Sequence, residues 1–347
     1  DDAPEHDDAP GLVLVPTGPL HRMPLHALPL GRRTGTGVDR ERLIDRFVVS
    51  YATTVDVLPR VSGRGAAQNG IAVLAPAAID GDESTPHRTV AFAQALATRA
   101  APAASLRVRH DATRDAVTDG TLDDRRLVFV AAHGRAGKPG DGRRSRGMLS
   151  GGTSTDLVDP ADGVRAGILM HEGTRGTVDG RWLSVRRIVS RARLPRVEHV
   201  QLLACDTHAD DPAPGDELAG LLCAFLVRGG RSVGGTLWKV DEVPAILVGW
   251  WLAAELLAGA TDKAGALRRV TQRMRRATHG EVIAALSEIR DAAASSPLGI
   301  DPQAQEALGE SIRIASEASP HEITELWQLH HWSPYVLHGA PQVRATR

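Results

Sequence analysis

The sequence contains very few cysteines. Only Cys205 and Cys223 occur among its 347 residues, too few for the disulfide framework of a small secreted domain. The first residues, Asp1–Asp8, are mostly acidic and lack the apolar segment of a secretory signal peptide. We therefore expect a protein of a reducing, cytoplasmic setting, and we interpret residues 1–10 as a tail or a cut linker.

Long apolar runs and a strong net charge are also missing. The longest apolar stretch, Ala245–Ala260, has 16 residues and includes Glu255. Because a bilayer requires a longer span, the stretch predicts a buried helix, introduced by Pro244. The formal net charge is −1, so no overall field attracts nucleic acid or an anionic membrane. We expect neither as a direct partner.

Motifs for phosphate and metal binding are absent as well. The sequence has no Gly-x-x-x-x-Gly-Lys-Ser/Thr stretch, and its histidines show no ligand spacing beyond the pair His330-His331. No cofactor and no metal are therefore expected. The arginines between Arg268 and Arg276 recur at helical spacing, and we interpret them as a solvated helix face rather than a polyanion site.

Strand-like and helix-like segments alternate through most of the chain. Apolar runs such as Ile71–Ala75 and Leu127–Ala132 are separated by helical patterns such as Asp216–Arg228. This alternation predicts an α/β fold with a mostly parallel central sheet and helices on both faces. We assign residues 66–347 to this core.

Two other segments complete the predicted organisation. Residues 11–65 are expected to form an N-terminal part that contains a β-hairpin, with Phe47–Tyr51 returning against Gly11–Val15. A stretch rich in glycine, arginine and aspartate, residues 137–180, interrupts the core and is expected to be a long loop.

Two predicted strands end in residues capable of chemistry. Leu127–Ala132 leads into His133, and Val200–Ala204 leads into Cys205. Parallel strands of an open α/β sheet carry sites at their carboxyl ends, and an imidazole beside a thiol produces a nucleophilic thiolate near neutral pH. The pair therefore points to a cysteine hydrolase. Taken alone, the histidine would more often be a hydrogen-bonded structural residue and the cysteine a small buried hydrophobe.

The glycine after His133 supports the same chemistry. A residue without Cβ lets a substrate approach the backbone closely, so the N–H groups of Gly134 and Cys205 are candidates for an oxyanion hole. Cys223 lies within the apolar segment Leu221–Leu226 and is expected to be structural.

Several segments around these residues follow a familiar order along the chain. They are Val15–Pro29, Ala131–Gly134, Leu203–Thr207, Gly215–Leu226, Arg231–Asp241 and Trp332–Gly339. Together they resemble the motifs of CHAT domains, which are caspase-like cysteine-protease modules often found with tetratricopeptide repeats. The resemblance extends over residues 11–340.

This resemblance implies a caspase-hemoglobinase-like three-layer sandwich and peptide-bond cleavage by a His/Cys dyad. His133 would be the general acid and base, Cys205 the nucleophile, and Gly134 a contact to the oxyanion. The expected partners are a protein or peptide substrate and an upstream regulatory region, such as tetratricopeptide repeats, or an activating partner. The family context implies a role in bacterial signalling, antiviral or other defence, or programmed cell death.

Two other functions remain open from the sequence. A catalytically silent CHAT adaptor would use the fold to relay a signal from upstream repeats. A redox sensor would oxidise Cys205, but no resolving cysteine lies near it in the sequence.

Substrate preference is expected to depend on residues near and beyond the nucleophile. In caspase-like folds the segment after the next strand lines a substrate pocket, which here indicates Thr236, Trp238 and Asp241. Asp206 or Asp241 would select a basic side chain, whereas Trp238 would form an apolar wall. Asp206 is equally suited to capping a turn, and Asp241 with Glu242 to capping the following helix.

Overall fold

The computed structural model describes eight stretches of the chain. They are residues 9–30, 41–52, 70–76, 87–108, 111–135, 167–170, 182–205 and 216–340. Asp206 and most of the expected loop at 137–180 lie outside them, as does the expected tail up to residue 8.

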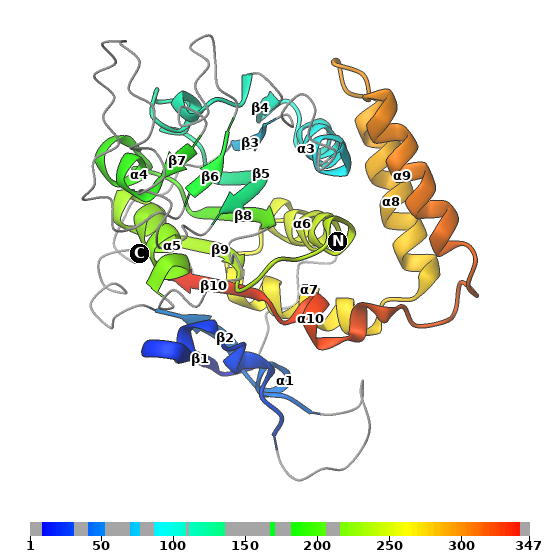
Figure 1. Cartoon of the computed structure of the whole chain (residues 1–347), viewed down its shortest axis with the longest axis horizontal. Coiled ribbons are helices and arrows are strands. Elements are labelled where there is room, and N and C mark those ends of the chain that lie inside the picture. The colour runs from blue at the N-terminus through cyan, green and yellow to red at the C-terminus, as the bar shows by residue number, and fades with distance from the viewer. Residues whose placement is uncertain are drawn as a thin grey trace, which may run out of the picture.

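The strands of these stretches join into one sheet (Figure 1). They are β1 Gly11–Leu14, β2 Val48–Tyr51, β3 Ile71–Ala75, β4 Ala104–Val108, β5 Leu127–Arg135, β6 Gly167–Leu169, β7 Trp182–Ser184, β8 His199–Cys205, β9 Ser232–Thr236 and β10 Tyr335–Gly339. Their order is β1-β2-β10-β9-β8-β5-β3-β4, with β6 and β7 extending from the end of β5. All pairs along this order are parallel except β10 with β9.

Helices cover both faces of this sheet. They are α1 Leu43–Arg46, α3 His87–Arg99, α4 Val185–Arg191, α5 Asp216–Arg228, α6 Glu242–Leu257, α7 Lys263–Arg276, α8 His279–Ala294, α9 Pro302–Ala315 and α10 Leu329–Trp332, with short 3₁₀ turns η1 Gly18–Arg22, η2 Leu25–Ala27, η5 Arg114–Val117 and η8 Glu325–Trp327. Helices α4 and α5 lie on one face, and α3 and α6 lie on the other (Figure 1). The predicted three-layer α/β architecture with a mostly parallel sheet is confirmed.

Strand β5 illustrates why the core has two halves. Leu127, Phe129 and Ala131 belong to the apolar cluster beneath α3 and α6. Val128 and Val130 belong to the cluster beneath α4 and α5. A strand that is buried on both faces needs a continuous apolar run, which is the pattern that the sequence shows.

Helix α6 is the buried helix predicted from the longest apolar stretch. It begins at Glu242 and ends at Leu257, three residues earlier at each end than that stretch. Trp250, Trp251 and Leu252 are all buried, although consecutive residues of a helix lie on different sides of it. A helix that is apolar on all sides must be enclosed, and α6 contacts strand β8 and the helices α3, α7 and α8.

The N-terminal strands differ from the expected hairpin. β1 pairs with β2 in parallel, with Gly11 opposite Val48 and Leu14 opposite Tyr51. Because parallel neighbours need a crossover connection between them, β1 and β2 do not form the hairpin that we expected. The strand β2 then joins β10, so the N-terminal part continues the main sheet.

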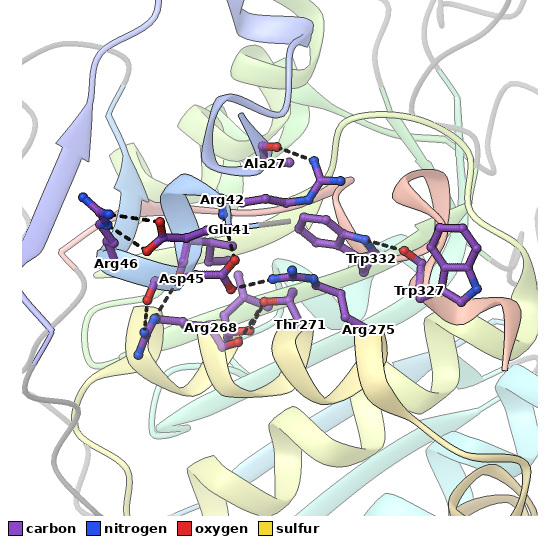
Figure 2. A network of polar contacts seen from close by, with 12 residues as sticks. Ala27, Glu41, Arg42, Asp45, Arg46, Arg268, Thr271, Arg275, Trp327 and Trp332 are labelled. Atoms are coloured by element: carbon purple, nitrogen blue, oxygen red, sulfur yellow. Dashed lines mark hydrogen bonds and ion pairs between the residues drawn. The ribbon is translucent and has the colours of Figure 1, made fainter. Parts of the chain in front are cut away.

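Two arginines of α7 differ from the prediction of a solvated face, which holds for the exposed Arg273 and Arg276. Arg275 is buried and forms an ion pair with Asp45 of the short helix α1. Arg268 donates hydrogen bonds to the carbonyl oxygens of Ile44 and Asp45 at 2.7 Å each. Figure 2 shows both side chains reaching from α7 towards α1. Helical spacing alone could not reveal this, because the partner lies more than 200 residues away in sequence.

Trp332 occupies the centre of the same network (Figure 2). The guanidinium carbons of Arg42 and Arg275 lie 5.4 and 5.1 Å from the centroid of its ring, within reach of cation–π attraction. Its indole N–H donates to the carbonyl oxygen of Trp327 at 3.0 Å. The network therefore fastens the N-terminal part to α7 and to the segment that leads into β10.

Among the residues that the structure describes, three histidines are buried: His26, His199 and His338. His26 shares a 2.7 Å hydrogen bond between its Nδ1 and the Tyr51 hydroxyl. His199 bonds the Ser232 hydroxyl at 2.9 Å through its Nδ1. Burial lowers the pKa of His26 to about 4 and the pKa values of His199 and His338 to about 3. All three imidazoles are therefore neutral in the folded protein near neutral pH.

These histidines predict acid destabilisation that begins well above the range in which carboxylates titrate. In the unfolded chain each imidazole binds a proton below about pH 6.5, whereas in the folded protein it does not until about pH 3 to 4. The contribution of each neutral imidazole to the free energy of unfolding is thus fully present above about pH 6.5. It is lost as the pH falls, by about 1 kcal/mol per buried histidine at pH 5.5. Urea unfolding at pH 7.5 and 5.5 measures the difference. His199→Gln should reduce the slope, His321→Gln at an exposed position should not, and equal stabilities at both pH values would contradict the prediction.

Candidate functional site

The carboxyl ends of β5 and β8 bring the two predicted chemical residues into register. The strands pair in parallel over seven positions, from Leu127 opposite His199 to His133 opposite Cys205. Neighbouring strands of a sheet lie about 4.8 Å apart, so the backbones at His133 and Cys205 are direct neighbours.

The pleat of the two strands assigns both positions to one face of the sheet. Position 133 continues the row of Phe129 and Ala131, and position 205 continues the row of Leu203, with a period of two residues. Phe129, Ala131 and Leu203 all belong to the cluster beneath α3 and α6. The two positions therefore lie side by side in adjacent rows, near the carboxyl edge where α/β sheets carry their sites.

A short hairpin borders this edge. β6 pairs with the end of β5, with Gly134 opposite Ile168 and Arg135 opposite Gly167, and β7 pairs with β6. Ile168 and Leu183 are fully buried. The expected loop at 137–180 therefore contains a strand in its second half, at Gly167–Leu169. The apolar residues 167–170, Gly-Ile-Leu-Met, were the signal for it within an otherwise polar stretch.

Helix α6 supports the β8 end through an unusually close contact. A Cβ added to Gly249 would lie 2.5 Å from Cδ1 of Leu203 and 2.9 Å from Cζ of Phe92. Only glycine allows the helix backbone to approach this near. The contact fixes α6 against Leu203, two residues before Cys205, and against α3 at the same time.

The residues predicted to select substrate lie in different surroundings. Thr236 is buried at the end of β9, opposite Tyr335 of β10. Trp238 is half-buried, and its indole N–H donates to the carbonyl oxygen of His330 at 3.2 Å. Asp241 is exposed and lines a pocket. The structure therefore leaves Asp241 accessible to a ligand and encloses Thr236.

Glu242 has a role that the sequence did not indicate. It was expected to cap α6 together with Asp241, but the Asp241 side chain forms no capping hydrogen bond. Glu242 instead accepts hydrogen bonds from the backbone N–H and the hydroxyl of Thr89, at 2.8 and 3.0 Å, and pairs with Arg88 at 3.0 Å. It thereby satisfies the first turn of α3 and joins the beginnings of α3 and α6.

Cys223 is half-buried in α5, on the opposite side of the sheet from α6. Within the described stretches, no three histidine, cysteine or carboxylate side chains come together as metal ligands. No helix in the same stretches is long and apolar enough to cross a membrane.

The sheet and its strand ends define the class of protein. A mostly parallel sheet with helices on both faces, and with a histidine and a cysteine side by side near the carboxyl ends of neighbouring strands, is a three-layer α/β architecture. The family model of the CHAT domain matches residues 2–340. The chain therefore belongs to the CHAT domain family.

The chain was also compared with curated proteins and with solved structures. A search of curated proteins gave no match. Among solved structures, the chain is similar to a chain of the Saccharomyces cerevisiae separase–securin complex, with 13% identity and a TM-score of 0.42. The similarity covers 86% of this chain and 14% of that chain, so the protein described here spans a small part of its neighbour's length.

The close approach at Gly249 yields a test of how the site is supported. Gly249→Ala should lower the free energy of unfolding by about 1–3 kcal/mol, because the added methyl group collides with Leu203 and Phe92. Gly309→Ala is the matched control. It lies in α9 with open space around its Cβ position, so it should raise stability by about 0.5–1 kcal/mol. Urea unfolding of both variants measures the effects, and stabilisation by both would refute the close contact.

Proposed function

We propose that the protein is a cysteine endopeptidase that cleaves specific protein substrates with His133 and Cys205. The observation that carries the proposal is the register of β5 and β8, which sets these two residues side by side at the carboxyl edge of the sheet. Membership of the CHAT family supports it.

The proposed mechanism assigns one task to each residue. The His133 imidazole accepts the proton of the Cys205 thiol, and the thiolate attacks the carbonyl carbon of the scissile peptide bond. The N–H groups of Gly134 and Cys205 donate to the oxyanion that forms. The imidazolium then protonates the leaving amine, and a water molecule, deprotonated by the imidazole, hydrolyses the thioester.

The surroundings of the strand ends suit a regulated enzyme. The β6–β7 hairpin lies along the end of β5 and stands opposite Gly134. A rearrangement of this hairpin would change access to the oxyanion contact, as loops beside active sites often do. We therefore include in the proposal a regulatory region or partner that controls the site, with a role in bacterial signalling, defence or programmed cell death.

Substitution of the proposed dyad tests the function directly. The wild-type protein is incubated with a proteome-derived peptide library, and new amino termini are identified by mass spectrometry. Cys205→Ala and His133→Ala should each reduce cleavage by at least about 10³-fold, while the thermal unfolding of both variants stays close to that of the wild type.

Cys223→Ala provides the control for the dyad experiment. Because Cys223 lies in α5 on the other side of the sheet, its substitution should leave cleavage unchanged. Identical fragment patterns from the wild type and Cys205→Ala would refute the protease and favour a catalytically silent adaptor.

A further inference from the structure

A pocket of about 520 Å³ lies among the helices α6, α8 and α9, near the same edge of the sheet. Figure 1 shows α8 and α9 as an antiparallel pair beside α3 and α6. The pocket wall is largely aliphatic, formed by Val243, Leu247, Val282, Leu286, Ile314 and Leu326. Ile314 is 54% exposed. Such a hollow suits an aliphatic side chain, whose burial favours binding.

Charged groups around the pocket are mainly acidic. Asp241, Glu242 and Glu325 contribute carboxylates, and Arg88 contributes a guanidinium. Arg88 is already paired with Glu242 at 3.0 Å. Asp241 and Glu325 are exposed, and neither forms an ion pair within the described stretches. Two carboxylates therefore remain to attract a cation from a ligand.

Two histidines, His279 and His331, line the pocket, and His331 does not offset these carboxylates. Burial, together with the neighbouring His330, lowers the pKa of His331 in spite of Asp241 and Glu325. His331 is therefore neutral near neutral pH, and the acidic character of the pocket persists.

The position of the pocket relates it to the cysteine strand. Asp241 follows β9, and Glu325 and His331 precede β10. The backbone N–H of Leu237 donates to the Pro334 carbonyl oxygen at 2.9 Å, which holds these two segments together. β9 pairs directly with β8, the strand that ends at Cys205. Since neighbouring strands lie about 4.8 Å apart, a few extended residues of a bound peptide span the distance from the end of β9 to the end of β8.

Exposed apolar side chains extend the surface beyond the pocket. Ile323, Trp327 and Leu329 are 44%, 38% and 43% exposed, and all three flank or belong to the segment that contains Glu325 and leads to His331. Contiguous exposed apolar surface with a polar rim is typical of a protein interaction site.

We propose that this pocket docks a segment of the protein substrate in which an aliphatic residue is followed by a lysine or arginine. The aliphatic side chain enters among Val243, Val282 and Ile314, which line the accessible part of the pocket, and the cation lies between Asp241 and Glu325. That the docked segment belongs to a substrate rests on the proposed protease function, whereas the chemistry of the segment follows from the residues of the pocket. Docking here would hold the substrate while a neighbouring segment crosses the Cys205 strand.

The first test measures binding without catalysis. Methyl-labelled Cys205→Ala protein is titrated with an acetylated hexapeptide, Gly-Ser-Leu-Lys-Ser-Gly, and followed by NMR. The methyl signals of Val282, Leu286 and Ile314 should shift, and that of Ile188, a buried residue of α4 on the other face, should not. Replacing the leucine of the peptide by serine should weaken binding by at least about tenfold. Replacing its lysine by glutamate should weaken binding by about fivefold or more.

Variants of the protein provide the second test. The double variant Asp241→Asn/Glu325→Gln should bind the leucine–lysine peptide about fivefold more weakly. Asp291→Asn removes a carboxylate that is 69% exposed on α8 and pairs with Arg290, so it should leave binding unchanged. Equal binding by the double variant, or shifts confined to other methyl groups, would overturn the proposal. Pocket signals that shift with protein concentration alone would assign the pocket to a second copy and also overturn it.

Kinetic measurements distinguish docking in the pocket from cleavage by Cys205. With a cleavable protein substrate that contains the leucine–lysine segment, the double variant should raise KM about fivefold and leave kcat unchanged. Unchanged KM would overturn docking of substrate even if cleavage by Cys205 is established. Peptide binding in the pocket without any Cys205-dependent cleavage would refute the protease and leave the ligand preference of the pocket intact.

Discussion

The parallel pairing of β5 with β8 is the constraint on which the rest of the site depends. Its register places Leu127 opposite His199 and, six residues later, His133 opposite Cys205. Because side chains alternate between the faces of a strand, a slip of one residue would move one of these two positions to the opposite face. The same slip would also exchange the rows that pack beneath α3 and α6 with those that pack beneath α4 and α5, and so would disrupt both apolar clusters. Burial of the apolar rows therefore fixes the relation between histidine and cysteine.

Contacts at both ends of β8 maintain this register. At its beginning, the buried ion pair between Lys263 and Glu198, 3.1 Å long, ties the first turn of α7 to the residue before the strand. At its end, Gly249 lets α6 pack directly on Leu203. Glu242, at the start of α6, also binds the first turn of α3. The helices on this face thus form a continuous support from the amino edge of the sheet to the edge that carries the proposed dyad and the pocket.

The sequence predicts those parts of the molecule that depend on local pattern. Apolar runs predicted the strands Ile71–Ala75 and Leu127–Ala132, and a fully apolar stretch predicted the buried helix α6. The residues at the strand ends followed from the same runs. Long-range pairing was not predictable in this way: β1 and β2 are parallel instead of forming a hairpin, β6 lies within the expected loop, and Arg275 turns inward to Asp45. Each of these depends on a partner distant in sequence, as does the contact of Glu242 with Thr89.

In the proposed dyad, His133 activates the Cys205 thiol. The pH dependence of alkylation of Cys205 measures this activation directly. Iodoacetamide reacts with the thiolate, so its rate against pH reports the pKa of Cys205 in a Cys223→Ala background. With His133 present, the account predicts a midpoint clearly below the value of about 8.5 for an ordinary thiol. In His133→Ala the midpoint should rise towards about 8.5. The same midpoint in both proteins would contradict the account.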